Sequence, residues 1–303
     1  MVGVESMTAI RFTPSESSML DNVDVIASET QILADMSHAI RRQLNAISGM
    51  AHLLETTELT DEQAGYVRAI TVSSQALNAL ISDSLELSKI DAGGLTINRT
   101  EFQLREVIGM AAPSAAATAL APLHPGQAFA ISAETNSAAK DHQSVAHGQR
   151  VELVVNFTND LPDHVIGDAG RLRQVVAILA SNAIQVSPEG GDVVVRLFAD
   201  ELSESHCRLH VSVRDSSSGI HADKVEHVFD AFQVLGPWQE RALIGPGLGL
   251  PLVKRIVNAI GGEVWCESQL GFGSTFHFVV TLDLAPATVD FESDAARETL
   301  AGR

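Results

Sequence analysis

Apolar residues recur at steps of three and four positions through two long stretches in the first third of the chain, which is typical of helices with one buried face. The first stretch predicts a helix that begins near Asp21–Ser28 and ends at about Glu55. The second predicts a helix that begins after Thr60 and ends at Gly93–Gly94, because glycine often follows a helix C-terminus. The apolar positions are Leu33, Met36, Ile40, Leu44, Ile47 and Leu54 in the first helix, and Val67, Ile70, Leu77, Leu80, Ile81, Leu85 and Ile90 in the second.

The turn between these helices is short, so we expect an antiparallel hairpin over residues 21–94, preceded by a disordered lead over residues 1–20. Thr60 and Gln63 have the spacing of a capping box, in which the side chain of each accepts a hydrogen bond from the backbone of the other. One hairpin cannot bury both apolar faces. We therefore expect a homodimer in which two hairpins form a four-helix bundle.

The rest of the chain predicts an α/β sandwich over residues 95–285, so the fold class is α+β. A mobile insertion is expected at about 122–148, which lacks a sustained period, and a flexible tail over 286–303. Expected strands are Val151–Phe157, Val193–Phe198, Arg208–Arg214, Glu263–Glu267 and Thr275–Leu282, with a short one inside Leu95–Arg105. Expected helices begin at Leu104, run from Ala169 to about Val186 behind the capping residue Asp168, and cover Lys224–Phe229 and Leu248–Ile260.

Acidic side chains dominate the charge: 38 Asp and Glu against 20 Lys and Arg give a net charge of −18. Nucleic acids and anionic membranes select basic surfaces, so we expect neither as a partner. No stretch has the order of a signal peptide or the length of a membrane span, which predicts a cytoplasmic protein without membrane insertion. Cys207 and Cys266 lack metal-ligand spacing and are expected to be buried thiols, although a disulfide stays open.

His38 lies two positions from both Met36 and Ile40 and therefore points away from the apolar face of its helix. The residues three and four positions from it are polar: Asp35, Arg41, Arg42 and Asn45. A histidine exposed beside basic side chains is well placed to meet a phosphate. From the helix alone, a solvated histidine on a bundle helix is the other interpretation.

Several stretches resemble the motifs of sensor histidine kinases, in the same order along the chain. Residues 36–45 read M-S-H-A-I-R-R-Q-L-N, similar to the family's H-box M-S-H-E-I-R-T-P-L-N. Residues 168–187 resemble the N-box helix, 213–220 the D-x-G-x-G loop, 228–233 the phenylalanine-rich box, 245–262 the G-T-G-L-G-L motif with its helix, and 264–276 the ending S-x-x-G-x-G-S-T-F. The resemblance covers about Ile32 to Leu282 apart from the insertion, and implies a gyrase-type ATPase fold for the second domain.

The resemblance also implies ATP and Mg²⁺ as cofactors and assigns site residues. These are His38 as phosphoacceptor, Asn182 as catalytic and magnesium-contacting amide, Asp215 and Gly219 at adenine, Gly245, Gly247 and Gly249 around the phosphates, and Arg241 in a lid expected over Val234–Ile244. Glycines before a helix allow backbone amides to approach a phosphate, and the helix dipole favours its charge. Taken singly, Asn182 is also consistent with an interhelical hydrogen bond, and Asp215 to Gly219 with a common turn.

The implied function is ATP-dependent phosphorylation of His38, followed by transfer to an aspartate of a response-regulator receiver domain, with input from an upstream sensor protein. The sequence departs from the family pattern at Ala39, Arg42, Gln43, Ile178, Gln185, Ser217 and Pro246. Ala39 replaces the acid that orients the family's histidine. Two hypotheses follow: an active but atypical histidine kinase, or a catalytically weak or inactive dimeric scaffold that binds a receiver or relays phosphate.

Overall fold

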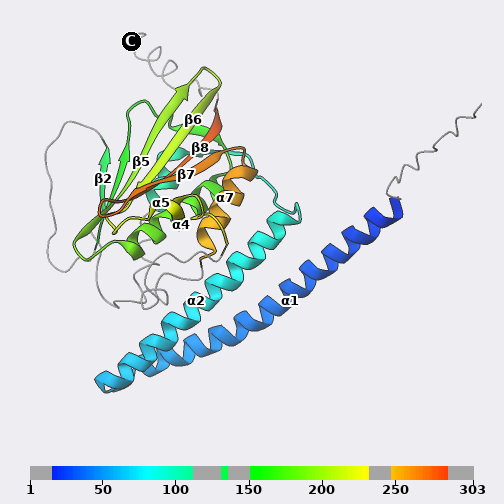
Figure 1. Cartoon of the computed structure of the whole chain (residues 1–303), viewed down its shortest axis with the longest axis vertical. Helices are drawn as coiled ribbons and strands as arrows, with labels where there is room; N and C mark the ends of the chain where they lie inside the picture. The colour runs from blue at the N-terminus through cyan, green and yellow to red at the C-terminus, as the bar shows by residue number, and fades with distance from the viewer. Residues whose placement is uncertain (1–15, 112–130, 136–150, 232–246, 286–303) are drawn as a thin grey trace, which may run out of the picture.

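A long helical hairpin begins the described part of the chain. The computed structural model describes residues 16–111, 131–135, 151–231 and 247–285, with side chains described from residue 36 onward except in 131–135. Helix α1 (Glu16–Glu55) and helix α2 (Asp61–Asp91) lie antiparallel, as Figure 1 shows. The predicted disordered lead is wrong for residues 16–20, which are helical and extend the hairpin. Residues 1–15 lie outside the described residues.

The predicted caps of α2 are confirmed. Thr60 Oγ1 accepts a 3.3 Å hydrogen bond from Gln63 N–H, and Gln63 Oε1 accepts a 3.0 Å bond from Thr60 N–H. After Asp91 the chain leaves the helix through Gly93 at φ +73°, a conformation that glycine adopts without strain. These signals fix the length of α2 and hence the register of the hairpin.

Packing within one hairpin leaves much apolar surface uncovered. Leu44 and Ala51 of α1 and Val67 of α2 are buried between the helices. Large apolar side chains of the predicted faces stay exposed, including Met36 at 56% and Ile47 at 46%. The hairpin thus carries an apolar face that its own two helices do not bury.

A mixed sheet of eight strands forms the second domain in the described part of the chain. Its order is β1-β4-β8-β6-β5-β3-β2, with β7 paired to β8. The strands are β1 (Thr100–Gln103), β2 (Ile131–Thr135), β3 (Val151–Phe157), β4 (His164–Gly167), β5 (Gly191–Leu202), β6 (His206–Arg214), β7 (Glu263–Gln269) and β8 (Gly273–Leu284). Strands β2, β3 and β5 are parallel to one another, and the other pairings are antiparallel.

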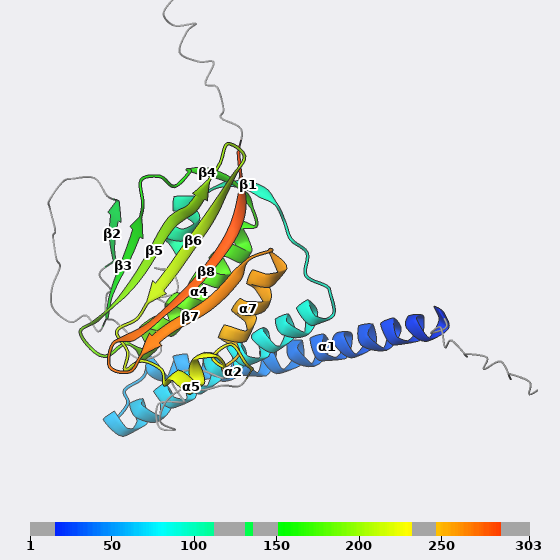
Figure 2. The same ribbon diagram turned by 45° about the horizontal axis from the view of Figure 1, so that its top comes forward.

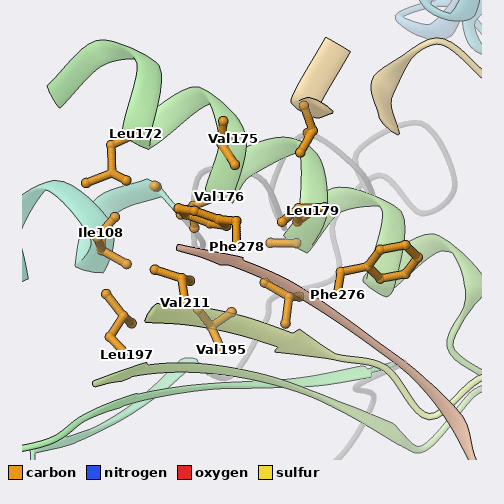
Figure 3. Close-up of a cluster of buried hydrophobic side chains, with 14 of the residues drawn as sticks. Ile108, Leu172, Val175, Val176, Leu179, Val195, Leu197, Val211, Phe276 and Phe278 are labelled. Carbon is orange, nitrogen blue, oxygen red and sulfur yellow. The ribbon is translucent and has the colours of Figure 1, made fainter. Parts of the chain in front are cut away.

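Helices α4 (Ala169–Val186) and α7 (Gly249–Ala259) cover one face of this sheet (Figure 2). Asp168 caps α4 as predicted, because its Oδ1 accepts a 3.0 Å hydrogen bond from Arg171 N–H. The core lies between α4 and the inward-facing residues of β5, β6 and β8, where Leu172, Leu197 and Phe278 are fully buried (Figure 3). Residues 104–111 form a further helix, as expected, and Leu104 and Ile108 join this core.

Some predicted elements need correction. Strand β2 lies inside the segment that we expected to be a mobile insertion, where it extends the parallel edge of the sheet beside β3. Strand β4 was missed because it has only four residues. The helix expected over Lys224–Phe229 is instead α5 (Ala222–Val225), followed by turns. The remainder of the insertion, most of the expected lid and the tail from residue 286 lie outside the described residues.

Candidate functional site

His38 is exposed on α1, as its position in the apolar pattern predicts. Arg41, one turn further along, donates a 3.3 Å hydrogen bond to Ser82 Oγ of α2. This contact shows which residues of α1 and α2 lie opposite each other along the hairpin. Ala39 is exposed beside His38 and offers no carboxylate. The side chain of Asp35, one turn before His38, lies outside the described residues.

Asp215 lies where β6 ends, and its side chain is almost fully buried. Its Oδ1 accepts hydrogen bonds of 3.0 Å from Ser217 N–H and from Ser274 N–H. Its Oδ2 is also buried but has no hydrogen-bond partner among the described residues. Burial raises the pKa of Asp215, while the hydrogen bonds from Ser217 and Ser274 oppose that shift. A buried oxygen left free in this way can accept one hydrogen bond from an amino group of a ligand.

Two glycines hold the Asp215 loop against the β7–β8 turn. Gly219 has φ +74°, and a Cβ there would overlap the carbonyl oxygen of Gln269. Gly273 has φ +87°, and a Cβ there would overlap the carbonyl oxygen of Asp215. Ser268 Oγ reinforces the contact by accepting a 2.8 Å hydrogen bond from Ile220 N–H. The close approach of the two backbones therefore requires glycine at both positions.

Asn182 lies on α4 beside the first residue of α7. A Cβ at Gly249 would lie 3.0 Å from Ile178 Cγ2 and 3.6 Å from Asn182 Nδ2. The C-terminal end of α4 also meets the Asp215 loop, because Ser216 N–H donates a 3.4 Å hydrogen bond to Ser187 Oγ. Asn182, Gly249 and Asp215 thus lie on elements that meet at one end of α4.

The N-terminus of α7 lacks a side-chain cap. Gly247 has φ +72°, and Leu248, at the N-cap position, makes no capping hydrogen bond. The free backbone amides of this first turn suit an anion such as a phosphate. Gly245 and Arg241 lie outside the described residues, so their predicted roles stay predictions.

The residues at this end of α4 fit a magnesium–nucleotide complex. Asn182 offers an amide oxygen, and Gln185 Oε1 is buried without a described hydrogen-bond partner. Mg²⁺ usually takes one or two protein oxygens and completes its shell with water and phosphate. Among the described residues there is no group of three His, Cys, Asp or Glu side chains that could hold a metal ion without such a substrate.

The structure brings some predicted residues together and leaves others apart. Asp215, Gly219, Asn182, Gly247 and Gly249 lie on elements that meet at one end of α4, whereas no described contact joins His38 to them. Assignment from the motifs overlooked the positioning roles of Ser268 and Ser274. Both stand in the stretch Ser268 to Phe276, whose Ser and Gly spacing was the signal that could have pointed to a tight turn.

Two family matches agree with this arrangement. Residues 28–93 match the His Kinase A (phospho-acceptor) domain, and residues 167–286 match the histidine kinase-, DNA gyrase B-, and HSP90-like ATPase family. No described helix is long and apolar enough to span a bilayer.

Curated relatives cover most of this chain. The sensor protein GacS of Pseudomonas syringae pv. syringae is 34% identical over 264 residues, which are 87% of this chain and 26% of GacS. The signal transduction histidine-protein kinase BarA of Escherichia coli K12 is 33% identical over 258 residues, which are 85% of this chain and 25% of BarA. The chain therefore spans about a quarter of the length of these relatives.

A solved structure agrees as well. The crystal structure of full-length ShkA in complex with AMPPNP matches with a TM-score of 0.59 and 28% identity, covering 85% of this chain and 47% of ShkA. The phosphoacceptor hairpin, the ATPase domain and the named relatives point the same way: this chain belongs to the sensor histidine kinase family, of which it contains the two-domain core.

Proposed function

We propose that this chain is a two-component signalling kinase that phosphorylates His38 with ATP and passes the phosphoryl group to an aspartate of a response-regulator receiver domain. The observation that carries the proposal is Asp215 Oδ2, a buried acceptor that has no hydrogen-bond partner among the described residues, while Oδ1 of the same carboxylate accepts two hydrogen bonds. An adenine amino group supplies the missing donor. Asn182, Gly247 and Gly249 then lie on the side where the phosphates would bind.

His38 acts as the nucleophile. A neutral imidazole carries one nitrogen lone pair, which attacks the γ-phosphorus while the bond from phosphorus to the β,γ-bridging oxygen breaks and ADP leaves. The amide oxygen of Asn182 would hold Mg²⁺, which neutralises charge on the phosphate oxygens when bound. The amides at the start of α7 add stabilisation for the same charge.

We further propose that this chain phosphorylates His38 slowly for a member of this family. General acid–base help from a positioned side chain is typically worth about 10²–10⁴-fold. Ala39 cannot supply it, and the structure describes no carboxylate in contact with His38. The non-catalytic scaffold hypothesis rests on Ala39 and on the departures from the family pattern in the second domain, and none of the relatives supports it. Those departures are Ile178, Gln185, Ser217 and Pro246.

Incubation with γ-labelled ATP and Mg²⁺ tests the proposal. We expect a slow, acid-labile and alkali-stable label that His38→Ala abolishes and that His52→Ala, a change at another exposed histidine of α1, leaves in place. Absence of label in the parent protein, together with receiver binding, would support the scaffold instead.

Assembly follows from the uncovered apolar face of the hairpin. We propose that two copies pair through this face as a four-helix bundle, which then offers His38 to a receiver domain, and that an upstream sensor protein acts on the bundle. Sedimentation equilibrium tests the dimer. Ile47→Glu on the exposed face should give monomers, whereas Arg68→Glu on the polar side of α2 should not.

A further inference from the structure

Two side chains shape the loop after β6 in consecutive steps. Asp215 Oδ1 accepts a 3.0 Å hydrogen bond from Ser217 N–H, and Ser217 Oγ accepts a 3.2 Å bond from Gly219 N–H. Each side chain thus binds the amide two residues further along, a local turn that aspartate and serine both favour. The serine continues the turn that the aspartate begins, so the loop from Asp215 to Gly219 is held by its own side chains.

The residues on both sides of Ser217 are anchored to neighbouring strands. Ser216 Oγ donates a 3.0 Å hydrogen bond to the carbonyl oxygen of Asp192 in β5 and accepts a 2.9 Å bond from Asp192 N–H. Gly271 N–H, in the turn between β7 and β8, donates a 2.8 Å bond to the carbonyl oxygen of Ser218. None of these anchors involves the Ser217 side chain, so they remain when that side chain is replaced.

The Ser217 hydroxyl lies beside the Asp215 carboxylate. Burial raises the pKa of Asp215, and the hydrogen bond from the Ser217 side chain is the largest of the influences that lower it. A hydroxyl has one proton to donate and two lone pairs that accept. Ser217 Oγ uses a lone pair to accept from Gly219 N–H, so its proton remains available for donation, and the residue is partly exposed. Asp215 and Ser217 thus place a hydrogen-bond acceptor and a donor side by side.

An acceptor beside a donor matches the edge of adenine. The amino group at C6 of adenine is a donor, and the ring nitrogens N1 and N7 on either side of it are acceptors. Guanine instead carries a carbonyl oxygen at C6, which would face the Asp215 carboxylate with no proton between two acceptors. Asp215 Oδ2 is buried without a described partner, so such a mismatch would be left uncompensated. Asp215 and Ser217 together therefore fit adenine and reject guanine.

We propose that Ser217 reads the adenine base together with Asp215: Asp215 Oδ2 accepts from the amino group, and the Ser217 hydroxyl donates to the neighbouring ring nitrogen, N1 or N7. The inference rests on the proposed function, which places adenine at Asp215, and adds a second residue that determines base specificity. Glycine, which the D-x-G-x-G motif has at this position, cannot make the contact. The departure at Ser217 thus adds a hydrogen bond to the base.

Calorimetric titration of the full chain tests the contact with ADP and two analogues that each lack one ring nitrogen, 1-deaza-ADP and 7-deaza-ADP. The parent should bind one of the analogues more weakly than ADP by about 3- to 10-fold, the size expected for one hydrogen bond between neutral groups. Ser217→Ala should weaken ADP by the same factor but should bind that analogue and ADP equally well. The other analogue should follow ADP in both proteins.

Ser218→Ala is the matched control, since it removes a hydroxyl from an exposed residue of the same loop, and it should bind all three nucleotides like the parent. Ser217→Thr keeps the hydroxyl and should keep the preference for ADP. An equal loss for all three nucleotides in Ser217→Ala, or no loss, would overturn the inference, because a residue that only supports the loop does not sense a single ring nitrogen. Either result leaves the proposed function standing, whereas a parent protein that does not bind ADP would overturn both.

Discussion

The backbone N–H of Ser274 donates a 3.0 Å hydrogen bond to Asp215 Oδ1, which ties the start of β8 to the end of β6. Ser217 N–H occupies the same oxygen from within the loop. The carboxylate is thereby held in one orientation, with only Oδ2 left to meet a ligand. The chain itself, rather than the ligand, sets the direction of recognition.

Asp215→Asn should weaken adenine-nucleotide binding by about 10- to 100-fold, because hydrogen bonds to charged groups contribute about 1.5–3 kcal/mol. The substitution keeps the shape of the side chain but can turn an NH₂ group toward the adenine amino group. Calorimetric titration with ADP measures the affinity. Glu152→Gln, at an exposed position of β3, is the charge-matched control and should bind ADP like the parent. Equal affinities for parent and Asp215→Asn would refute adenine recognition by this residue.

Gly219→Ala should destabilise the ATPase domain by more than Gly271→Ala. Both positions have positive φ, +74° and +82°, so each substitution incurs the left-handed penalty of about 1–2 kcal/mol. Only at Gly219 would the new Cβ also overlap the carbonyl oxygen of Gln269, whereas the space around Gly271 is open.

Urea unfolding of the two glycine variants gives the comparison directly, and titration with ADP shows whether the Asp215 loop moves. Equal losses of unfolding free energy would mean that the Gly219–Gln269 approach is not required by the fold.

His277 should make the stability of the domain sensitive to acid. Trp265 stacks on its ring, with centroids 5.0 Å apart, and its Nε2 is buried without a described hydrogen-bond partner. Burial lowers the pKa of His277, and the nearby His210 lowers it further, while Glu267 opposes the shift. The fold thus favours the neutral ring. Its contribution is fully present above the unfolded pKa of about 6.5 and is lost as the pH falls through the lower folded pKa.

Thermal unfolding between pH 8 and pH 5 tests the effect of His277. The parent should lose more stability on acidification than His277→Gln, which cannot be protonated. His227→Gln, at an exposed histidine paired with Asp230, is the control and should follow the parent. Parallel curves for parent and His277→Gln would contradict the prediction.

The sequence predicted the hairpin well because its signals are local. The capping residues Thr60 and Gln63 and the terminal Gly93 act within a few positions of the helix ends that they define. Strand β2 escaped prediction because its place depends on pairing with β3, and such pairing leaves little trace in a five-residue segment. The start of α1 at Glu16 was missed for a similar reason, since residues 16–20 show no apolar period.

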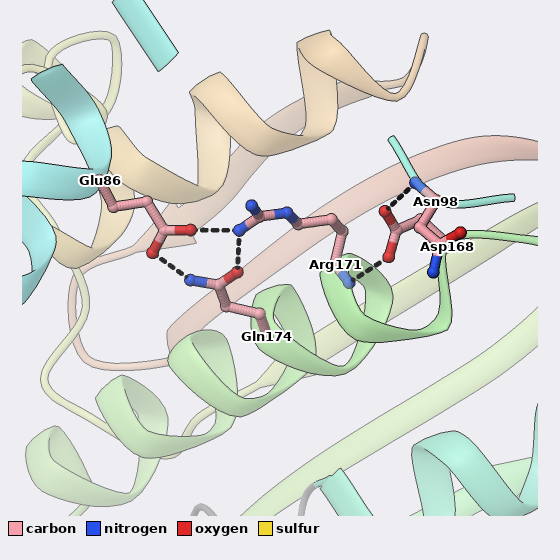
Figure 4. A network of polar contacts seen from close by, with 5 residues as sticks. All are labelled: Glu86, Asn98, Asp168, Arg171 and Gln174. Carbon is pink, nitrogen blue, oxygen red and sulfur yellow. Dashed lines mark hydrogen bonds and ion pairs between the residues drawn. The ribbon is translucent and has the colours of Figure 1, made fainter. Parts of the chain in front are cut away.

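The features of the candidate site also divide into those that local motifs predict and those that depend on contacts between distant segments. Asp215, Asn182 and the glycines were found from motifs, but the free Oδ2 and the role of Ser274 depend on strands brought together from distant parts of the chain. Outside the site, the contact of Glu86 with Arg171 joins residues 85 positions apart (Figure 4). Nothing in the local pattern of either helix marks them as partners.

Ala39→Glu should speed phosphorylation of His38, because it places an acid directly after the histidine. The family's H-box, which residues 36–45 resemble, has an acid at that position. Position 39 is exposed, so the new carboxylate requires no repacking. General acid–base assistance is typically worth about 10²–10⁴-fold, and an acid added without its supporting contacts should reach about tenfold, somewhat below that range. The initial rate of His38 labelling measures the gain. Gln43→Glu adds the same charge at an exposed position four residues after Ala39 and should leave the rate unchanged. An equal gain in both variants would assign the effect to net charge, and no gain in Ala39→Glu would show that the missing acid does not limit the reaction.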